Sequence, residues 1–481
     1  MLSSPDPDIS VPLCVDLDDT LIKTDILFET VVLLAKRRPV ALLALPIWFI
    51  QGRGYLKQQI AQRVKPEISR LPFRRGLIDF LRGEKTRGRT LVLVTAADHG
   101  IAEEVNTHLQ LFDETIGSRA GRNLKGKQKA ALLMQRYGAK GFDYVGDSHS
   151  DFAVWRVSRR ALVVSERPAF IKAVAAVVPV DRTFPKTERQ PYAWLRALRL
   201  HQWSKNFLVF VPIITAHKVL DAAILLRGLI AFVSFSFICS AVYLVNDLMD
   251  LEADRAHETK RLRALAAGEL SILHAVLLTL ALFVAGGAIG VFLGLGFLIV
   301  IAIYIAANLT YSIMFKRIIM LDVVMLAGFY ALRLLAGGAA TALYCSEWLL
   351  AFSIFFFFCL AMVKRFSELQ RATGMEETVS IGRGYKRSDL EAIGSFGTAS
   401  GLISVLVFVL YIMSPDVRVL YRRPAILLLL CPLFLYWITR IWFKAKRGEI
   451  PEDPVVFALT DPTSYLAGLW AMLVLFAATV E

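Results

Sequence analysis

Hydrophobic and polar positions are arranged in two different ways along this chain of 481 residues. From about residue 207 onward, apolar runs are separated by short polar loops, and a helix needs roughly 20 such residues to cross a bilayer. Before about residue 185, the apolar runs have the length of single buried strands, about 4 to 8 residues, and several end in polar side chains. The pattern predicts an N-terminal α/β, Rossmann-like domain and a C-terminal all-α multispan membrane domain.

The apolar runs of the second part predict about nine transmembrane helices. They lie at about 207–220, 224–245, 271–291, 293–313, 320–340, 348–363, 393–413, 424–442 and 464–480. A polar stretch with two prolines at 181–191 marks the boundary between the two parts. We expect a soluble head over 1–185, a linker and interfacial helix over 186–206, and a membrane domain over 207–481.

A helical insertion is expected inside the head, at about 25–73. Its segment from Pro39 to Ile50 is apolar but too short to span a membrane. One interpretation is a helix in the core of the insertion. The other is an apolar surface that rests on the bilayer and admits a lipid-borne substrate.

Charge and composition narrow the class of protein. Hydrophobic residues make up 56%, and the net charge is +14. The cations gather in loops on one side of the predicted spans, which favours positive-inside topology over nucleic-acid binding. The five cysteines form no Cys-x-x-Cys pair, and the N-terminus has no apolar signal segment. We expect an integral protein of a bacterial inner or plasma membrane, with its head and active sites in the cytoplasm.

Three aspartates follow the second apolar run. Asp247, Asp250 and Asp254 are spaced i, i+3 and i+7, which places them on one face of a helix, directly after Asn246. Carboxylates this close repel one another unless a cation neutralises them, and oxygen ligands favour Mg²⁺, often with a phosphorylated partner. Four cations follow that suit the remaining phosphate charge: His257, Lys260, Arg261 and Arg263. We interpret the stretch as a Mg²⁺-diphosphate site; the alternative is a solvated loop of mixed charge.

The head has its own set of polar side chains at the ends of predicted strands. Asp16 and Asp18 follow one strand, Thr95 ends a second, and Asp147 and Asp151 follow a third. Lys125 opens a helical stretch between the last two strands, with Lys129 one turn later. Side chains at the carboxyl ends of strands in α/β sheets border the ligand crevice.

These motifs, in this order, resemble the haloacid-dehalogenase-like (HAD) phosphohydrolases over about residues 10 to 180. The resemblance implies that Asp16 is a nucleophile that forms an aspartyl-phosphate, that Asp18 is the general acid and base, and that the insertion is a cap. It also implies that Thr95 and Lys125, or in second place Lys129, hold the phosphoryl group. Asp16 and Asp147 would bind Mg²⁺, with Asp18 and Asp151 at the metal site. The alternative is a structural, inactive head.

The membrane part resembles the UbiA superfamily of intramembrane prenyltransferases over about residues 195 to 481. The first signature, Asn-Asp-x-x-Asp-x-x-x-Asp, is complete from Asn246 to Asp254. The second signature departs from the pattern of the aromatic prenyltransferases, because Asp322 is followed four residues later by Leu326. Five segments instead look like the polyprenyl-phosphate phosphoribosyltransferases (decaprenylphosphoryl-5-phosphoribose synthases): 202–206, 252–257, 330–338, 364–369 and 453–458.

Further polar residues of the membrane part are candidates for substrate binding. Asp322, Tyr330 and Arg333 have spacings that allow one shared helix face, and charged residues within a span usually mark a functional site. A structural Asp–Arg pair is the alternative. The cations expected near a lipid phosphate are Lys205, Lys316, Arg333 and Lys364, and Arg365, Asn206 and Tyr311 are further candidates for substrate binding.

The two resemblances together imply a bifunctional enzyme. The membrane part would transfer 5-phosphoribose from phosphoribosyl diphosphate to polyprenyl phosphate, with Mg²⁺ as cofactor, and the head would remove the 5-phosphate. The nearest alternative is a prenyltransferase that joins a prenyl diphosphate to an aromatic or other small acceptor, with a head of separate substrate. A transporter and a membrane-tethered phosphatase are the others. The oligomeric state stays open, a homo-oligomer included.

Overall fold

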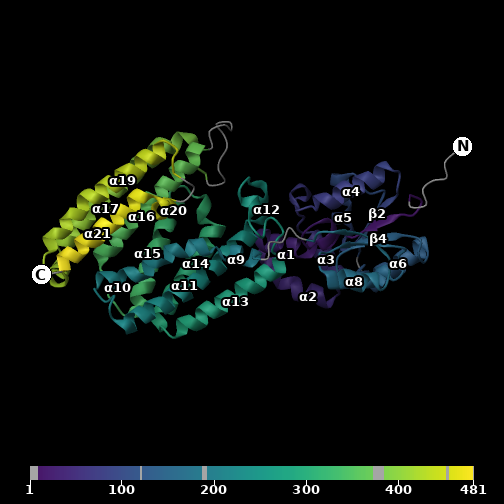
Figure 1. Cartoon of the computed structure of the whole chain (residues 1–481), viewed down its shortest axis with the longest axis horizontal. Coiled ribbons are helices and arrows are strands. Elements are labelled where there is room, and N and C mark those ends of the chain that lie inside the picture. The colour runs from purple at the N-terminus through teal and green to yellow at the C-terminus, as the bar shows by residue number, and fades with distance from the viewer. Residues whose placement is uncertain (1–8, 120–121, 187–191, 372–383, 451–453, 480–481) are drawn as a thin grey trace. The chain divides into compact units, whose positions relative to one another are not determined.

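A computed structural model describes residues 9–119, 122–186, 192–371, 384–450 and 454–479 (Figure 1). The chain divides into two compact units. The first unit joins Met1–Arg199 to Tyr243–Leu280, and the second joins Leu200–Val242 to Ala281–Glu481. The aspartate stretch after the second apolar run therefore belongs to the same unit as the head.

The first unit contains a parallel sheet of six strands. Their order is β3-β2-β1-β4-β5-β6, and β1 pairs in parallel with both β2 and β4. The strands are β1 (Leu13–Val15), β2 (Leu91–Asp98), β3 (Glu114–Ser118), β4 (Asp143–Gly146), β5 (Ala161–Val164) and β6 (Val180–Phe184). A parallel sheet of this kind agrees with the predicted Rossmann-like class.

Helices cover both faces of this sheet. Alternate residues of a strand point to opposite faces, so Leu13 and Val15 join one core, whereas Cys14 joins the other. The first face packs against α4 (Arg75–Thr86) and α5 (His99–Leu109), and the second against α6 (Lys127–Tyr137), α7 (Phe152–Trp155) and α8 (Pro168–Ala175) (Figure 1). Burial on both faces explains why the strands read as continuous apolar runs.

The segment between β1 and β2 is helical, as expected of an insertion. It holds α1 (Ile26–Arg37), α2 (Leu45–Ile50) and α3 (Arg53–Ala61), which share a small core around Leu34 and Ile60. The apolar segment Pro39–Ile50 within it is buried only in part. Trp48 is buried in this core, whereas Val40, Leu43 and Ile50 are 78%, 79% and 84% exposed.

The membrane part contains eight helices, within the described ranges, that are long and apolar enough to cross a membrane. They span Ala222–Met249 (α11), Ile272–Val291 (α13), Leu295–Ile313 (α14), Leu321–Thr341 (α15), Glu347–Arg371 (α16), Arg387–Met413 (with α17, Leu390–Met413), Pro424–Lys446 (with α19, Leu430–Lys446) and Pro462–Thr479 (α21). Shorter helices are α9 (Ala193–Leu198), α10 (Val211–Thr215), α12 (Leu251–Ala256), α18 (Pro415–Leu420) and α20 (Pro454–Thr460). This multispan helical class was predicted.

The count of nine is not confirmed, and the difference lies in the first apolar run. Residues Leu200–Phe210 form a 3₁₀ helix, and α10 that follows is only five residues long. Pro212 has no backbone N–H to continue a helix from the preceding turn. A run of 14 residues, about 21 Å as an α-helix, would also be too short for a hydrocarbon core of about 30 Å.

Consecutive helices of the second unit pack closely, because small residues lie at their contacts. The neighbours are α14 with α15, α15 with α16, and α16 with α17. A Cβ at Gly337 of α15 would lie 2.0 Å from the carbonyl oxygen of Val209, which belongs to the 3₁₀ helix Leu200–Phe210. Glycine is therefore needed where this backbone approaches α15.

We expect Gly337→Ala to destabilise the membrane domain by about 3 kcal/mol, because the new methyl group cannot fit without moving backbone. The matched control is Gly328→Ala on the same helix, where a Cβ would meet no atom within 4 Å. The measurement is the midpoint of thermal unfolding of the full chain in detergent. Equal midpoints for the two variants would contradict the close approach of Val209 to α15.

Candidate functional site

Three predicted side chains of the head lie at one edge of its sheet. Asp16 directly follows β1, Thr95 lies on β2, and Asp147 directly follows β4. Because these strands are adjacent and parallel, their carboxyl ends share an edge, where α/β sheets bind ligands. The N–H of Asp16 donates to the carbonyl of Val145 at 3.1 Å, and the Thr95 hydroxyl accepts the N–H of Ala97 at 2.9 Å.

A lysine pairs with Asp16, and it is Lys129 rather than Lys125. Lys129 Nζ lies 2.9 Å from Asp16 Oδ1, whereas Lys125 precedes α6 in a loop. Burial acts to lower the pKa of Lys129, but the carboxylates of Asp16 and Asp151 raise it above its ordinary value. The N–H of Leu17 also donates to Asp16 Oδ1, at 2.8 Å. These two contacts engage Oδ1 and leave the lone pairs of Oδ2 for another group.

Asp18 lies in the turn after Asp16. Its Oδ1 accepts the N–H of Ile26 at 2.8 Å, at the start of α1. Burial, together with the charge of Asp25, raises the pKa of Asp18 well above its usual range. The raised pKa favours the protonated form of Asp18, and a protonated carboxyl group can donate its proton to a leaving group.

Asp151 is held by several donors. Its Oδ2 accepts the N–H groups of Asp147 and Ser148 at 3.2 and 3.0 Å, and its Oδ1 accepts the hydroxyl of Tyr144 at 3.0 Å. Lys129 in turn donates to the Tyr144 oxygen at 2.9 Å. Asp151 therefore orients both the loop that bears Asp147 and the lysine that pairs with Asp16.

Asp147 contacts two donors, Thr20 at 3.3 Å and the ammonium group of Lys186. Burial raises the pKa of Asp147 to about 7, although Lys186 acts to lower it. Within the described ranges, no three His, Cys, Asp or Glu side chains are close enough to enclose a metal ion. The donor set nevertheless fits Mg²⁺, because Asp16 and Asp147 offer carboxylate oxygens and each already contacts a cation.

The aspartate stretch of the membrane part is not one straight helix. α11 ends at Met249, and α12 begins at Leu251, so the helix breaks at Asp250. Asp247 and Asp254 nevertheless converge, since Arg263 Nη1 lies 3.1 Å from Asp247 Oδ1 and 2.5 Å from Asp254 Oδ2. Two of the three predicted ligands thus contact a single cationic nitrogen, although the described contacts of Arg263 do not include Asp250.

The carboxylates of Asp247 and Asp254 are buried charges that lie beside cations. Asp247 also contacts Arg199, and both carboxylates are buried. Burial raises the pKa of Asp254, although Arg263 acts to lower it. Two carboxylates that share one cation provide the oxygen ligands and negative charge that Mg²⁺ requires. The donor set therefore fits this ion.

The other predicted polar residues of this stretch come before and after Asp247 and Asp254 in the sequence. Asn246 directly precedes Asp247 on α11, and the Asn246 carbonyl accepts the N–H of Asp250 at 2.9 Å. His257 follows α12, and its Nδ1 accepts the N–H of Thr259 at 3.3 Å. Lys260 and Arg261 lie on the 3₁₀ turn Lys260–Leu262.

A second group of polar side chains lies inside the second unit. Its contacts differ from the prediction that Asp322, Tyr330 and Arg333 share one helix face. Asp322 on α15 pairs with Arg365 of α16 at 2.6 Å and accepts the hydroxyl of Tyr385 at 2.6 Å. Arg365 also pairs with Glu368. Asp322 therefore forms an ion pair with a neighbouring helix, because the two helices pack closely, and the described contacts do not pair it with Arg333. An Asp–Arg pair is therefore present, but it joins Asp322 to Arg365 and not to Arg333 as the alternative supposed.

Arg333 instead brings Asn206 and Tyr330 together. Its Nε donates to Asn206 Oδ1 at 2.9 Å, and its guanidinium lies 5.4 Å from the ring centre of Tyr330. Tyr311 on α14 packs edge-on against Phe329. The remaining predicted cations lie on separate elements of this unit: Lys205 in the 3₁₀ helix Leu200–Phe210, Lys316 after α14 and Lys364 on α16.

Several residues of these groups were missed from the sequence. Lys186 and Arg199 contact Asp147 and Asp247, and Tyr385 contacts Asp322. Lys57 of α3 donates to the carbonyl of Ala96, beside Thr95, at 2.5 Å. No local pattern marks these residues, since each reaches its partner across a long stretch of chain. Asp453, the first residue of the predicted motif 453–458, lies outside the described residues.

The chain is similar in sequence to known membrane proteins. A model of the family described as "UbiA prenyltransferase family" matches residues 207–460. The uncharacterised protein y4nM of Sinorhizobium fredii is 38% identical over 465 residues, which cover 96% of this chain and 90% of that protein. The decaprenyl-phosphate phosphoribosyltransferase of Mycolicibacterium smegmatis is 35% identical over 206 residues, 40% of this chain and 65% of that protein. A UbiA homologue of Archaeoglobus fulgidus, solved with GPP and Mg²⁺, is 17% identical, with a TM-score of 0.45, over 60% of this chain and 99% of that one.

Proposed function

The chain belongs to the UbiA prenyltransferase family, and from this premise we propose that it is a bifunctional enzyme of phosphoribosyl transfer and phosphate removal. The membrane part would transfer 5-phosphoribose from phosphoribosyl diphosphate to polyprenyl phosphate. The head would then hydrolyse the 5-phosphate, giving polyprenyl-phosphoryl ribose. The observation that carries the proposal is the convergence of Asp247 and Asp254 on one cation.

The choice of donor and acceptor rests on two supports. The relative from Mycolicibacterium smegmatis is named a decaprenyl-phosphate phosphoribosyltransferase and matches in the membrane part. The second acidic signature of aromatic prenyltransferases is incomplete here, and its remaining acid, Asp322, is neutralised by Arg365. A single acidic site suits one diphosphate, which is that of the sugar donor.

The transfer step follows from charge. Asp247 and Asp254, with Asp250 beside them, would hold Mg²⁺, which when bound supplies positive charge to the diphosphate. Lys260 and Arg261 would neutralise further phosphate charge. An oxygen of polyprenyl phosphate forms the bond to the anomeric carbon while the bond to pyrophosphate breaks, and pyrophosphate departs with the electron pair. The lipid phosphate would be held by cations among Lys205, Lys316, Arg333 and Lys364.

Phosphate removal would use the edge of the sheet. Oδ2 of Asp16 attacks the 5-phosphate, while Lys129 and Thr95 hold the phosphoryl oxygens. Asp16 and Asp147 would hold Mg²⁺, which when bound would supply positive charge to the phosphoryl group. Asp18 donates a proton to the departing 5-oxygen and then accepts one from the water that hydrolyses the aspartyl-phosphate. The balance is one water consumed and one inorganic phosphate released. We place both sites in the cytoplasm, on the evidence of the cationic loops.

The test is an assay of the purified full chain with polyprenyl phosphate and ribose-labelled phosphoribosyl diphosphate. We expect labelled lipid with Mg²⁺ and none with EDTA. The control is the EDTA sample divided in two, with Mg²⁺ added later to one half only. Labelled lipid identified by mass spectrometry as polyprenyl-phosphoryl ribose supports both steps. The alternative, an aromatic prenyltransferase, would be established by a different result: no labelled lipid from these substrates, but prenylation of 4-hydroxybenzoate from a prenyl diphosphate.

A further prediction concerns the lysine of the head. We expect Lys129→Met to reduce hydrolysis of p-nitrophenyl phosphate about a hundredfold or more, because the variant loses the charge that pairs with Asp16 and would stabilise the phosphoryl group. Lys125→Met, four residues earlier, is the matched comparison. The steady-state rate of each variant is measured on the full chain. A larger loss for Lys125→Met would return the lysine role to that residue.

A further inference from the structure

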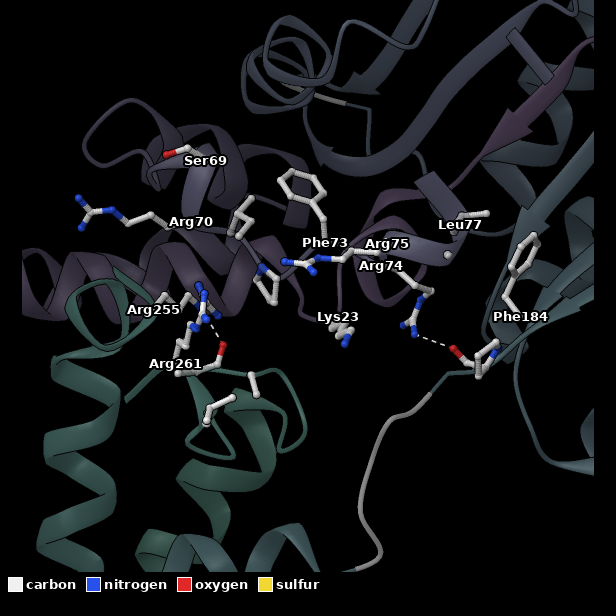
Figure 2. Close-up of a pocket in the computed structure, with 17 residues that line it drawn as sticks. Lys23, Ser69, Arg70, Phe73, Arg74, Arg75, Leu77, Phe184, Arg255 and Arg261 are labelled. Carbon is white, nitrogen blue, oxygen red and sulfur yellow. Dashed lines mark hydrogen bonds between the residues drawn. The ribbon is translucent and has the colours of Figure 1, made fainter. Parts of the chain in front are cut away.

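A cavity of about 800 Å³ in the first unit is lined by six cations and, among its described lining residues, by no carboxylate. The cations are Lys23, Arg70, Arg74, Arg75, Arg255 and Arg261. Figure 2 shows the head's cations on one side of this cavity, and Arg255 of α12 and Arg261 of the turn after α12 on the other. A volume of this size is that of a small-molecule site, which ranges over about 300–1,000 Å³.

The walls of the cavity are fixed by contacts within the first unit. Arg255 donates to both carboxylate oxygens of Glu29 on α1, at 2.6 and 3.1 Å. Gly268, at a φ of +72°, lies so close to Lys23 that a Cβ would come within 2.8 Å of the lysine Cβ. The segment after α12 is therefore packed against the head, and the cavity between them is a built feature.

One wall of the cavity is bonded to the turn that follows Asp16. Arg74 Nε donates to the carbonyl of Thr20 at 3.0 Å, and its Nη2 donates to the carbonyl of Asp19 at 3.2 Å. The opposite wall contains Arg261, seven residues after Asp254 in the chain. The cavity thus borders both segments that bear the proposed catalytic aspartates.

The charges of the cavity are only partly neutralised. Arg70 pairs with Glu67, Arg74 is bonded to carbonyls, and Arg255 is paired with Glu29. Within the described part of the chain, the guanidinium groups of Arg75 and Arg261 make no such contact. Each offers five N–H donors in a planar fork that matches a phosphate. One arginine comes from each wall, so a ligand with two phosphate groups can engage both.

We propose that this cavity binds a pentose that carries a phosphate group at each end. The assignment rests on the proposed function, in which two molecules have this chemistry. One is soluble phosphoribosyl diphosphate, and the other is the phosphorylated head group of the lipid product on its way to Asp16. Arg75 recognises one phosphate group and Arg261 the other, and the repulsion among the cations is relieved when the ligand binds.

The experiment compares Arg75→Gln with Arg82→Gln in the full chain. Arg82 is an exposed arginine two turns later on α4 that does not line the cavity, and it is the matched control. Thermal unfolding shows whether each variant folds, and Arg75→Lys, which keeps the charge but removes the planar fork that matches a phosphate, replaces Arg75→Gln if that variant does not fold.

The first arm measures binding of labelled phosphoribosyl diphosphate in EDTA, where the carboxylates of the Asp247 pair would repel it. The second arm measures the KM for dephosphorylation of synthetic polyprenyl-phosphoryl 5-phosphoribose in detergent. We expect Arg75→Gln to raise the dissociation constant, the KM or both about tenfold, the loss of one charged contact, and Arg82→Gln to change neither.

A change in the first arm alone identifies the soluble donor as the ligand, and a change in the second alone identifies the lipid head group. Values for Arg75→Gln within twofold of the unaltered chain in both arms would overturn the proposal. Failure of the proposed function is seen separately, as the absence of labelled lipid with Mg²⁺ in the transfer assay. The first arm still reports on the cavity in that case.

Discussion

Replacing Asp247 with asparagine is expected to reduce ribosyl transfer at least about a thousandfold, which corresponds to roughly 4 kcal/mol of lost transition-state stabilisation. Asparagine keeps the shape of the side chain but removes the charge that would bind Mg²⁺. It also leaves Arg199 and Arg263 with one carboxylate fewer. The charge of the diphosphate site then becomes more positive, which favours a bare anion over a metal ion. The measurement is formation of labelled lipid by the full chain at saturating Mg²⁺.

Glu258→Gln is the control for this prediction, because Glu258 is an exposed acid a few residues after the pair. It removes the same charge from the same segment, so a general electrostatic effect would lower the transfer rate of both variants. Retention of more than a tenth of the activity by Asp247→Asn, with normal thermal unfolding, would remove Asp247 from the metal site. Phosphatase activity of the head, measured on p-nitrophenyl phosphate, should be unchanged in both variants.

The second large effect is expected for Asp16→Asn, which should abolish removal of the 5-phosphate and leave ribosyl transfer intact. The amide oxygen is a poor nucleophile, so no aspartyl-phosphate forms, and a loss of at least about a thousandfold is expected. The variant should therefore accumulate the lipid that still carries the 5-phosphate. Mass spectrometry of the lipid products distinguishes the two lipids by the mass of one phosphate group.

Asp79→Asn on α4 is the control, since Asp79 is exposed and pairs only with Arg82 among its described ion pairs. It should give the dephosphorylated lipid at the normal rate. The expected outcome separates the two activities on one chain, because the product of the first step becomes visible only when the second is blocked. Continued production of polyprenyl-phosphoryl ribose by Asp16→Asn would mean that the head acts through another nucleophile.

Much of the fold was predictable because its signals are local. Buried strands such as Leu91–Val94 are continuous apolar runs, and spans such as Leu295–Ile313 have the length that a bilayer requires. The parallel sheet and the multispan helical class followed from these runs. The first run failed as a span because its length is marginal and a proline interrupts it.

The site was predictable only where one segment carries several of its residues. Asp16 with Asp18, Asp147 with Asp151, and Asp247 with Asp254 are close in sequence, so the geometry of a strand end or a helix turn keeps them close in space. The partners of these acids are far away in the chain: Lys129 lies 113 positions after Asp16 and contacts it at 2.9 Å. The sequence-based prediction placed Lys125 first and Lys129 second, because both lie at the start of the same helix.

The sequence by itself determined where the acids lie, that an α/β head precedes a multispan helical part, and which family the chain resembles. Only the tertiary structure decided that Asp322 pairs with Arg365 rather than Arg333, and that Arg75 and Arg261 border one cationic cavity. The physical reason is the range of the forces involved. Hydrophobic periodicity is written into neighbouring residues, whereas an ion pair or a cavity depends on which distant surfaces pack together, and packing is settled by the whole chain.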